Sequence, residues 1–186
     1  MTIHSEHPFA TPAGDRDPLR RFRGRMASAV SVWSAGEGRD RAGWTVSSFL
    51  VADGDPGEVV GVLDEDSALG ERVADQLEES EQGEGGGTFV VNLLAWEQRG
   101  LADAFAGLAP APGGVFRLGT WTDTDWGPAL EGSAGWLGVR LRTGPLEHAG
   151  WGLLVRGTVE HVELPELPPE GPLLHLQGRY RQGRLT

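Results

Sequence analysis

Short stretches of alternating or continuously apolar residues dominate this sequence, and few helical patterns lie between them. Six such stretches predict strands: residues 29–34, 44–48, 59–63, 88–94, 136–142 and 153–162. Neighbouring parallel strands need a crossover connection, usually a helix, and the helical patterns do not alternate with the strands in that way. The sequence therefore predicts a mainly β fold, a closed or partly closed antiparallel sheet with flanking helices.

Three segments have the spacing of amphipathic helices: residues 17–26, 69–77 and 96–105. In the first, Asp17 suits an N-cap and Pro18 the first turn. In the third, Leu101 and Phe105 are spaced to face inward. The run from Gly83 to Gly87 connects a helix to a strand, the reverse of the order in a phosphate loop.

Length and composition indicate one domain. The chain has 186 residues, enough for a single core. Residues 1–16 are polar, include two prolines and show no period, so we expect a flexible N-terminal arm followed by one domain over residues 17–186.

Charge and residue types exclude several classes of function. The formal net charge of −11 argues against nucleic-acid binding. The chain has no Cys, its His residues lack metal-ligand spacing, and no Ser occupies a Gly-x-Ser-x-Gly elbow. No signal peptide or membrane-spanning run is evident, so no membrane association is expected and the cytoplasm is the expected location.

Six short motifs occur in a characteristic order. They are Gly43-Trp44-Thr45-Val46-Ser47-Ser48-Phe49, the segments 89–94, 101–107 and 127–137, Pro172-Leu173-Leu174, and Gly178-Arg179-Tyr180-Arg181. Together they resemble the flavin reductase-like family of FMN-binding split β-barrels, from about Asp17 to Arg181. The resemblance implies a split β-barrel that binds FMN, with FAD as the alternative, and NADH or NADPH as electron donor.

The resemblance assigns the first motif to the flavin ring. In the family this segment lies along the isoalloxazine, so the ring-binding candidates are Trp44, Thr45, Val46, Ser47 and Ser48. Small hydroxyl residues let backbone N–H groups approach the ring edge. From composition alone, the same pattern is also that of an ordinary solvated strand.

The flavin phosphate is assigned near the start of the second helix. The family places a Ser there, which corresponds to Ser67, with Leu63 and Asp64 just before it. A helix N-terminus favours an anion, but Ser67 also suits a simple N-cap. The carboxylates of residues 64–66 would repel a dianion unless they point outward or an arginine compensates; the candidates are Arg20, Arg21, Arg23, Arg25 and Arg99.

Two further candidates have structural alternatives. Asn92 lies among apolar strand residues, so its amide bonds either the backbone or the cofactor. Phe105 is spaced for the inner face of its helix, where a core position is favoured over a flavin contact.

No catalytic residue is identified. Many family members carry a Gly-Asp-His motif near the nicotinamide pocket, where this chain has Gly150-Trp151-Gly152, and His148 reads as an exposed loop residue. Hydride transfer to flavin needs no protein acid or base.

The leading hypothesis is a homodimeric NAD(P)H:flavin oxidoreductase that supplies reduced flavin to a monooxygenase. The alternatives are a non-enzymatic or electron-transfer FMN protein without a nicotinamide site, and a split barrel without flavin.

Overall fold

A computed structural model describes residues 17–81 and 86–184. The expected N-terminal arm and part of the glycine connector lie outside these ranges. The helical elements are α1 (Pro18–Arg25), α2 (Ala68–Glu81), η1 (Trp96–Gln98), α3 (Arg99–Phe105) and η2 (Val115–Arg117). None of the described helices has both the length and the apolar character needed to cross a membrane.

Among the described residues, more lie in strands than in helices, as predicted. The first strands are β1 (Ser28–Ala29), β2 (Ser31–Ala35), β3 (Ala42–Val46), β4 (Phe49–Ala52), β5 (Glu58–Leu63) and β6 (Thr88–Leu93). The others are β7 (Trp121–Thr124), β8 (Gly127–Leu130), β9 (Gly135–Leu141), β10 (Glu147–Ala149), β11 (Gly152–Glu163), β12 (Leu173–Leu176) and β13 (Arg179–Gln182).

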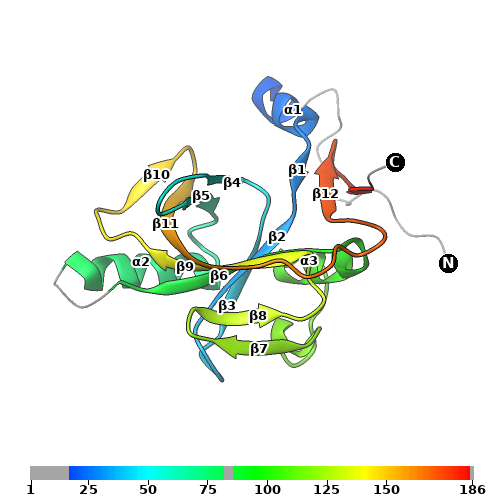
Figure 1. Cartoon of the computed structure of the whole chain (residues 1–186). Helices are drawn as coiled ribbons and strands as arrows, with labels where there is room; N and C mark the ends of the chain where they lie inside the picture. Colours follow the sequence, from blue (N-terminus) through cyan, green and yellow to red (C-terminus); the bar gives the residue numbers. More distant parts are fainter. Residues whose placement is uncertain (1–16, 82–85, 185–186) are drawn as a thin grey trace.

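The main sheet is antiparallel throughout and curls on itself. Its order is β3-β2-β6-β9-β11-β5-β4, with β10 paired to β11. Two smaller sheets complete the fold, β1-β12-β13 and the hairpin β7-β8. Figure 1 shows α1, β1 and β12 rising together from one end of the curled sheet, with α2 at the other end. The predicted mainly β fold of the split-barrel type, with flanking helices, is confirmed, and its main sheet forms a half-barrel.

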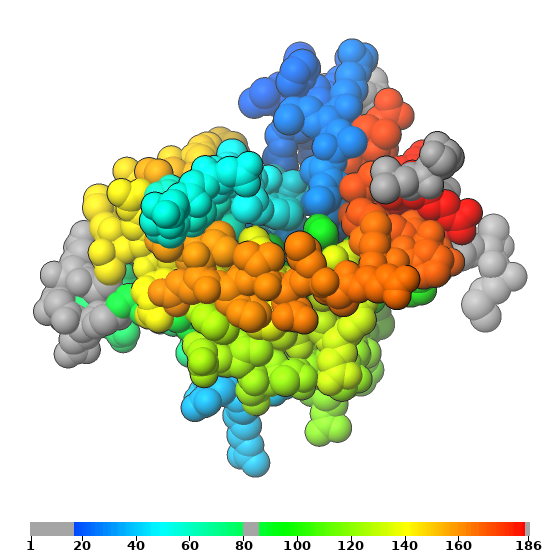
Figure 2. All heavy atoms as spheres, in the orientation of Figure 1, coloured from blue at the N-terminus to red at the C-terminus, as the bar shows by residue number. Residues whose placement is uncertain are grey.

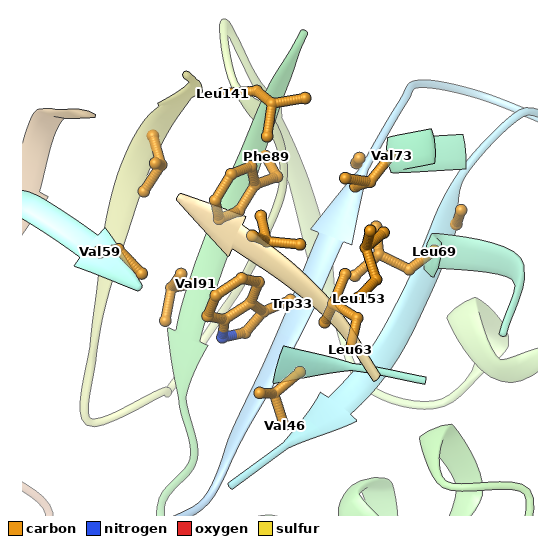
Figure 3. Close-up of a cluster of buried hydrophobic side chains, with 14 of the residues drawn as sticks. Trp33, Val46, Val59, Leu63, Leu69, Val73, Phe89, Val91, Leu141 and Leu153 are labelled. Atoms are coloured by element: carbon orange, nitrogen blue, oxygen red, sulfur yellow. The ribbon is translucent and has the colours of Figure 1, made fainter. Parts of the chain in front are cut away.

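The curled sheet encloses one core, and α3 covers a second. In the first core, the Trp33 ring stacks on Phe89 with centroids 4.9 Å apart, and α2 contributes Leu69 and Val73 (Figure 3). In the second core, Phe105 packs among residues of β2, β8 and β12. The two cores hold the curled sheet in shape, and this sheet carries the β4–β5 edge near which α1 lies.

The structure corrects several sequence-based boundaries. The expected strand 29–34 is divided between β1 and β2, which belong to different sheets. The strand expected to reach Ser48 ends at Val46, so Ser47 and Ser48 form the turn into β4. The expected helix 96–105 begins as the 3-10 turn η1, and the short strands β4, β7, β8, β10, β12 and β13 were not predicted.

Candidate functional site

A cleft of about 1090 Å³ lies between the α1 segment and the edge of the main sheet. One wall comes from α1, β1 and the β12–β13 hairpin, and the other from the β3–β4 turn, β4 and β5. In Figure 2 the α1 segment stands above the body of the molecule, close to β4. The lining residues are Arg20, Arg23, Gly24, Met26, Ala27, Ser28, Ala29, Ser47, Ser48, Phe49, Leu50, Val60, Gly61, Val62, Leu108, His175 and Gly178.

The α1 wall is held mainly by backbone contacts. The Asp17 carboxylate accepts a hydrogen bond from the Leu19 amide at 3.4 Å, and Pro18 occupies the first turn, as predicted. At the other end, the Gln177 amide donates to the Gly24 carbonyl at 2.6 Å. No α1 side chain is buried. The helix is therefore anchored to the β12–β13 hairpin and leaves its side chains free for the cleft and for solvent.

The β3–β4 turn forms the opposite wall. The Ser48 carbonyl accepts a hydrogen bond from the Val62 amide at 2.9 Å, which fixes the turn against β5. The Arg23 guanidinium reaches across and donates to Ser48 Oγ at 3.1 Å. The Ser47 hydroxyl bonds to no other residue in the described ranges. The turn thus offers a free hydroxyl and small side chains to anything in the cleft.

The cleft is electropositive in an acidic chain. Two arginines line it, whereas no Asp or Glu of the described part of the chain does, and the chain has a net charge of −11. Within the described ranges, neither Arg20 nor Arg23 pairs with a carboxylate. A site with this charge suits an anionic ligand.

His175 lines the cleft from β12, and Tyr180 is its partner on β13. Burial, and secondly the charge of Arg23, lower the pKa of His175, so this ring is uncharged near neutral pH. The Tyr180 hydroxyl donates to Asp103 Oδ1 at 2.8 Å, and burial followed by this bond raises the pKa of the phenol. The two rings meet edge-on with centroids 6.1 Å apart. The hairpin is thereby tied to α3, which carries Asp103.

Only two of the ten predicted site residues line the cleft: Ser47 and Ser48. The other three residues predicted to bind the flavin ring, Trp44, Thr45 and Val46, lie on β3. Thr45 Oγ1 donates to the Ala102 carbonyl of α3 at 2.8 Å. Val46 is buried in the first core, and Trp44 is partly buried against it. They position the turn without facing the cleft.

The three residues predicted to bind the flavin phosphate, Leu63, Asp64 and Ser67, do not line the cleft. Leu63 is buried in the first core. Ser67 Oγ donates to the Asp64 carbonyl at 2.6 Å and accepts from the Gly70 amide at 3.0 Å. The Asp64 carboxylate accepts from the Asp66 amide at 3.2 Å. In this geometry the Ser67 hydroxyl caps α2.

Asn92 and Phe105 are interior residues. The Asn92 amide nitrogen donates to the Val32 carbonyl at 3.1 Å and to Ser34 Oγ at 2.9 Å, and its oxygen accepts from the Leu130 amide at 2.7 Å. Of the two alternatives for this amide, the geometry shows bonds within the protein. Phe105 packs in the second core, edge-on to Phe116 with centroids 5.1 Å apart.

The segment that replaces the family's Gly-Asp-His lies outside the cleft lining. Trp151 is fully exposed at the tip of the β10–β11 hairpin. His148 lies on β10, exposed as expected, and its Nε2 is 2.9 Å from Glu65 Oε2.

Sequence reasoning did not select the residues that give the cleft its charge. Arg20 and Arg23 were two of five candidate arginines, and the sequence assigned no role to His175. The signal available was the density of arginine in residues 20–25, which hold four.

Comparison with known proteins places the chain in a family. The model of the flavin reductase like domain matches residues 23–184. The chain belongs to the flavin reductase-like family. No curated protein sequence matches it.

Many solved structures share its fold, and three of them illustrate the likeness. The Streptomyces globisporus C-1027 NADH:FAD oxidoreductase SgcE6, in complex with NAD and FAD fragments, is 23% identical with a TM-score of 0.72, covering 92% of this chain and 94% of that one. A nitrilotriacetate monooxygenase component B homologue from Mycobacterium thermoresistibile is 26% identical (TM-score 0.69; 87% and 83% covered). The styrene monooxygenase flavin reductase SMOB from Pseudomonas putida S12 is 23% identical (TM-score 0.68; 91% and 99% covered).

Proposed function

We propose that this protein is an NAD(P)H-dependent flavin oxidoreductase that binds FMN, with FAD as the alternative, in the cleft beside α1. The observation that carries the proposal is the make-up of the cleft: the Ser47–Ser48 turn faces Arg20 and Arg23, and no carboxylate of residues 17–81 or 86–184 lines the space. Membership of the flavin reductase-like family supports it.

The lining residues fit a flavin nucleotide. Val60, Gly61 and Val62 give one face of the cleft an apolar surface for a flat ring. The free Ser47 hydroxyl and the backbone of the turn supply hydrogen-bonding groups for the ring edge. A bound flavin supplies the chemistry, since it accepts a hydride from a reduced nicotinamide. The protein's part is to bind and orient both rings and to exclude water from between them.

The proposal includes two partners. One is a flavin-dependent monooxygenase that consumes the reduced flavin; the description of SMOB as the flavin reductase of a styrene monooxygenase supports this. The other is a second copy of the chain. Its support is an unburied apolar stripe made by Leu19 and Phe22 of α1 and by Met26, the C-cap residue after the helix, which are 66%, 65% and 58% exposed.

An oxidation assay tests the activity. We expect the purified protein to oxidise NADH or NADPH when FMN or FAD is added, followed as loss of nicotinamide absorbance, with little oxidation when flavin is omitted. Bound flavin without nicotinamide oxidation would favour the electron-transfer alternative. Absence of both flavin binding and oxidation would contradict the proposal and favour a split barrel that does not use flavin.

A further inference from the structure

The arginines of α1 divide between two sides of the helix. Arg20 and Arg23 line the cleft, whereas Arg21 and Arg25 do not. Since successive residues of an α-helix are about 100° apart, the first pair lies on one side and the second pair on the other. The helix thus directs two cations into the cleft and two away from it.

The two cleft arginines retain most of their hydrogen-bonding capacity. Arg23 uses one N–H to reach Ser48 Oγ at 3.1 Å. A guanidinium has five N–H donors in a planar fork that matches phosphate oxygens. On the body of the protein the situation differs, because Arg41 and Arg140 each pair with a carboxylate. No comparable partner reaches Arg20 or Arg23 from the described ranges.

Two further groups converge on the same space. Ser48 Oγ accepts a hydrogen bond from the Arg23 guanidinium. His175, half-buried on β12 in the same wall as α1, also lines the cleft. Arg23 also acts electrostatically on His175, which indicates that the two side chains are near one another. Helix α1, the β3–β4 turn and β12 therefore bring donors to one place from three separate parts of the sequence.

We infer that Arg20 and Arg23, with Ser48 and His175, form an anion subsite that binds the phosphate or pyrophosphate group of a nucleotide. The inference rests on the proposed function, which supplies two nucleotides with this chemistry, the flavin and the nicotinamide cofactor. It moves the anion site away from Ser67, whose hydroxyl already bonds at both ends and stands next to Asp64 and Asp66.

Single substitutions on α1 test the subsite with matched controls. The test variants are Arg20→Ala and Arg23→Ala, and the controls are Arg21→Ala and Arg25→Ala, which remove the same charge from the same helix. Dissociation constants for FMN, riboflavin, NADH, NADPH and inorganic pyrophosphate are measured by calorimetry. Loss of a charge-assisted bond should weaken a phosphate-bearing ligand by about ten- to a hundred-fold, and added salt should reduce the difference.

The ligands distinguish the source of the anion. If the subsite holds the flavin phosphate, the test variants bind FMN more weakly and riboflavin unchanged. If it holds the nicotinamide nucleotide, NADH or NADPH loses affinity and both flavins are unchanged; a loss confined to NADPH assigns the 2′-phosphate. Either pattern supports the subsite, provided that the control variants behave as the unmodified protein.

Two results would overturn the inference. In the first, the test variants bind every phosphate-bearing ligand as tightly as the controls do. In the second, they lose affinity equally for FMN and riboflavin, which would indicate a change in the shape of the cleft. Failure of the proposed function looks different. The unmodified protein would then bind neither flavin nor nicotinamide nucleotide, yet would still bind pyrophosphate and lose it on Arg23→Ala.

Discussion

A single hydroxyl, that of Ser67, separates two accounts of the phosphate site. It accepts a hydrogen bond from the Gly70 amide at 3.0 Å, as an N-cap does. We predict that Ser67→Ala lowers the free energy of unfolding by about 1 kcal/mol, the usual value of a cap. FMN affinity should change less than about twofold, since the bond that is lost lies within the protein. Denaturant unfolding and an FMN titration measure the two effects.

Ser67→Thr is the control, because it keeps the hydroxyl and should preserve the stability. The family resemblance leads to the opposite expectation, in which Ser67→Ala weakens FMN by about ten- to a hundred-fold and leaves riboflavin alone. That result would return the phosphate to the start of α2 and argue against the role of Arg20 and Arg23.

His175 gives a prediction about pH. Its pKa in the folded protein is lowered from 6.5 by burial and by Arg23, so the unfolded chain binds the proton more tightly. Stability from this group is therefore full above its unfolded pKa and is lost as the pH falls towards the folded value. We predict that His175→Gln makes the free energy of unfolding less dependent on pH between about 7 and 5. Urea unfolding at several pH values checks this prediction. If the free energy of unfolding depends on pH equally in both proteins, the prediction is wrong.

The residues of the site differ in how far a sequence can identify them. Ser47 and Ser48 were predicted because they belong to a contiguous motif, and both line the cleft. Asn92 could be recognised as buried and polar, but the partners of its amide come from β2 and β8, which are distant in sequence. Arg23 contacts Ser48, 25 positions away in the sequence, and that contact depends on how the β1-β12-β13 sheet lies against the main sheet.

At the scale of elements, the turn between β3 and β4 determines the shape of the cleft. Ser47 has no hydrogen bond to the described part of the chain, and its side chain borders the space proposed for the ring. We predict that Ser47→Leu weakens FMN and riboflavin by the same factor, at least about tenfold, because a bulky side chain collides with the ring and not with the phosphate. Fluorescence titrations of both ligands give the ratio. A loss for FMN alone would place the phosphate, and not the ring, at this turn.

Periodicity identified the buried elements and missed the exposed ones. The predicted strand 59–63 matches β5, in which alternate residues are buried, and the helix predicted over 69–77 lies within α2. By contrast, β4 is exposed at three of its four residues, so it has no apolar alternation to detect. The strands β12 and β13 are four residues each and obtain their partners only from one another and from β1. Register and partner choice are tertiary facts that a local pattern does not contain.

For the whole molecule, the apolar stripe on α1 has no partner within the described chain, and we predict that a second copy covers it. Leu19 and Phe22 lie on one side of α1, which has no buried residue, and the exposed Met26 follows as the C-cap residue, at the border of the cleft. Burying such a stripe in a symmetric dimer would remove its apolar area from water in both copies. Light scattering at micromolar concentration should therefore give twice the chain mass of 19.9 kDa.

Two substitutions distinguish this interface from general surface stickiness. Phe22→Glu places a charge in the stripe and should shift the protein towards monomer, because a buried unpaired carboxylate is costly. Trp151→Glu changes a fully exposed aromatic residue at the β10–β11 hairpin and should leave the dimer intact. The stripe lies beside the face that carries Arg20 and Arg23, so dissociation should also weaken nucleotide binding if the second copy steadies α1. A monomeric unmodified protein, or a dimer that Phe22→Glu does not affect, would contradict the assignment of this surface.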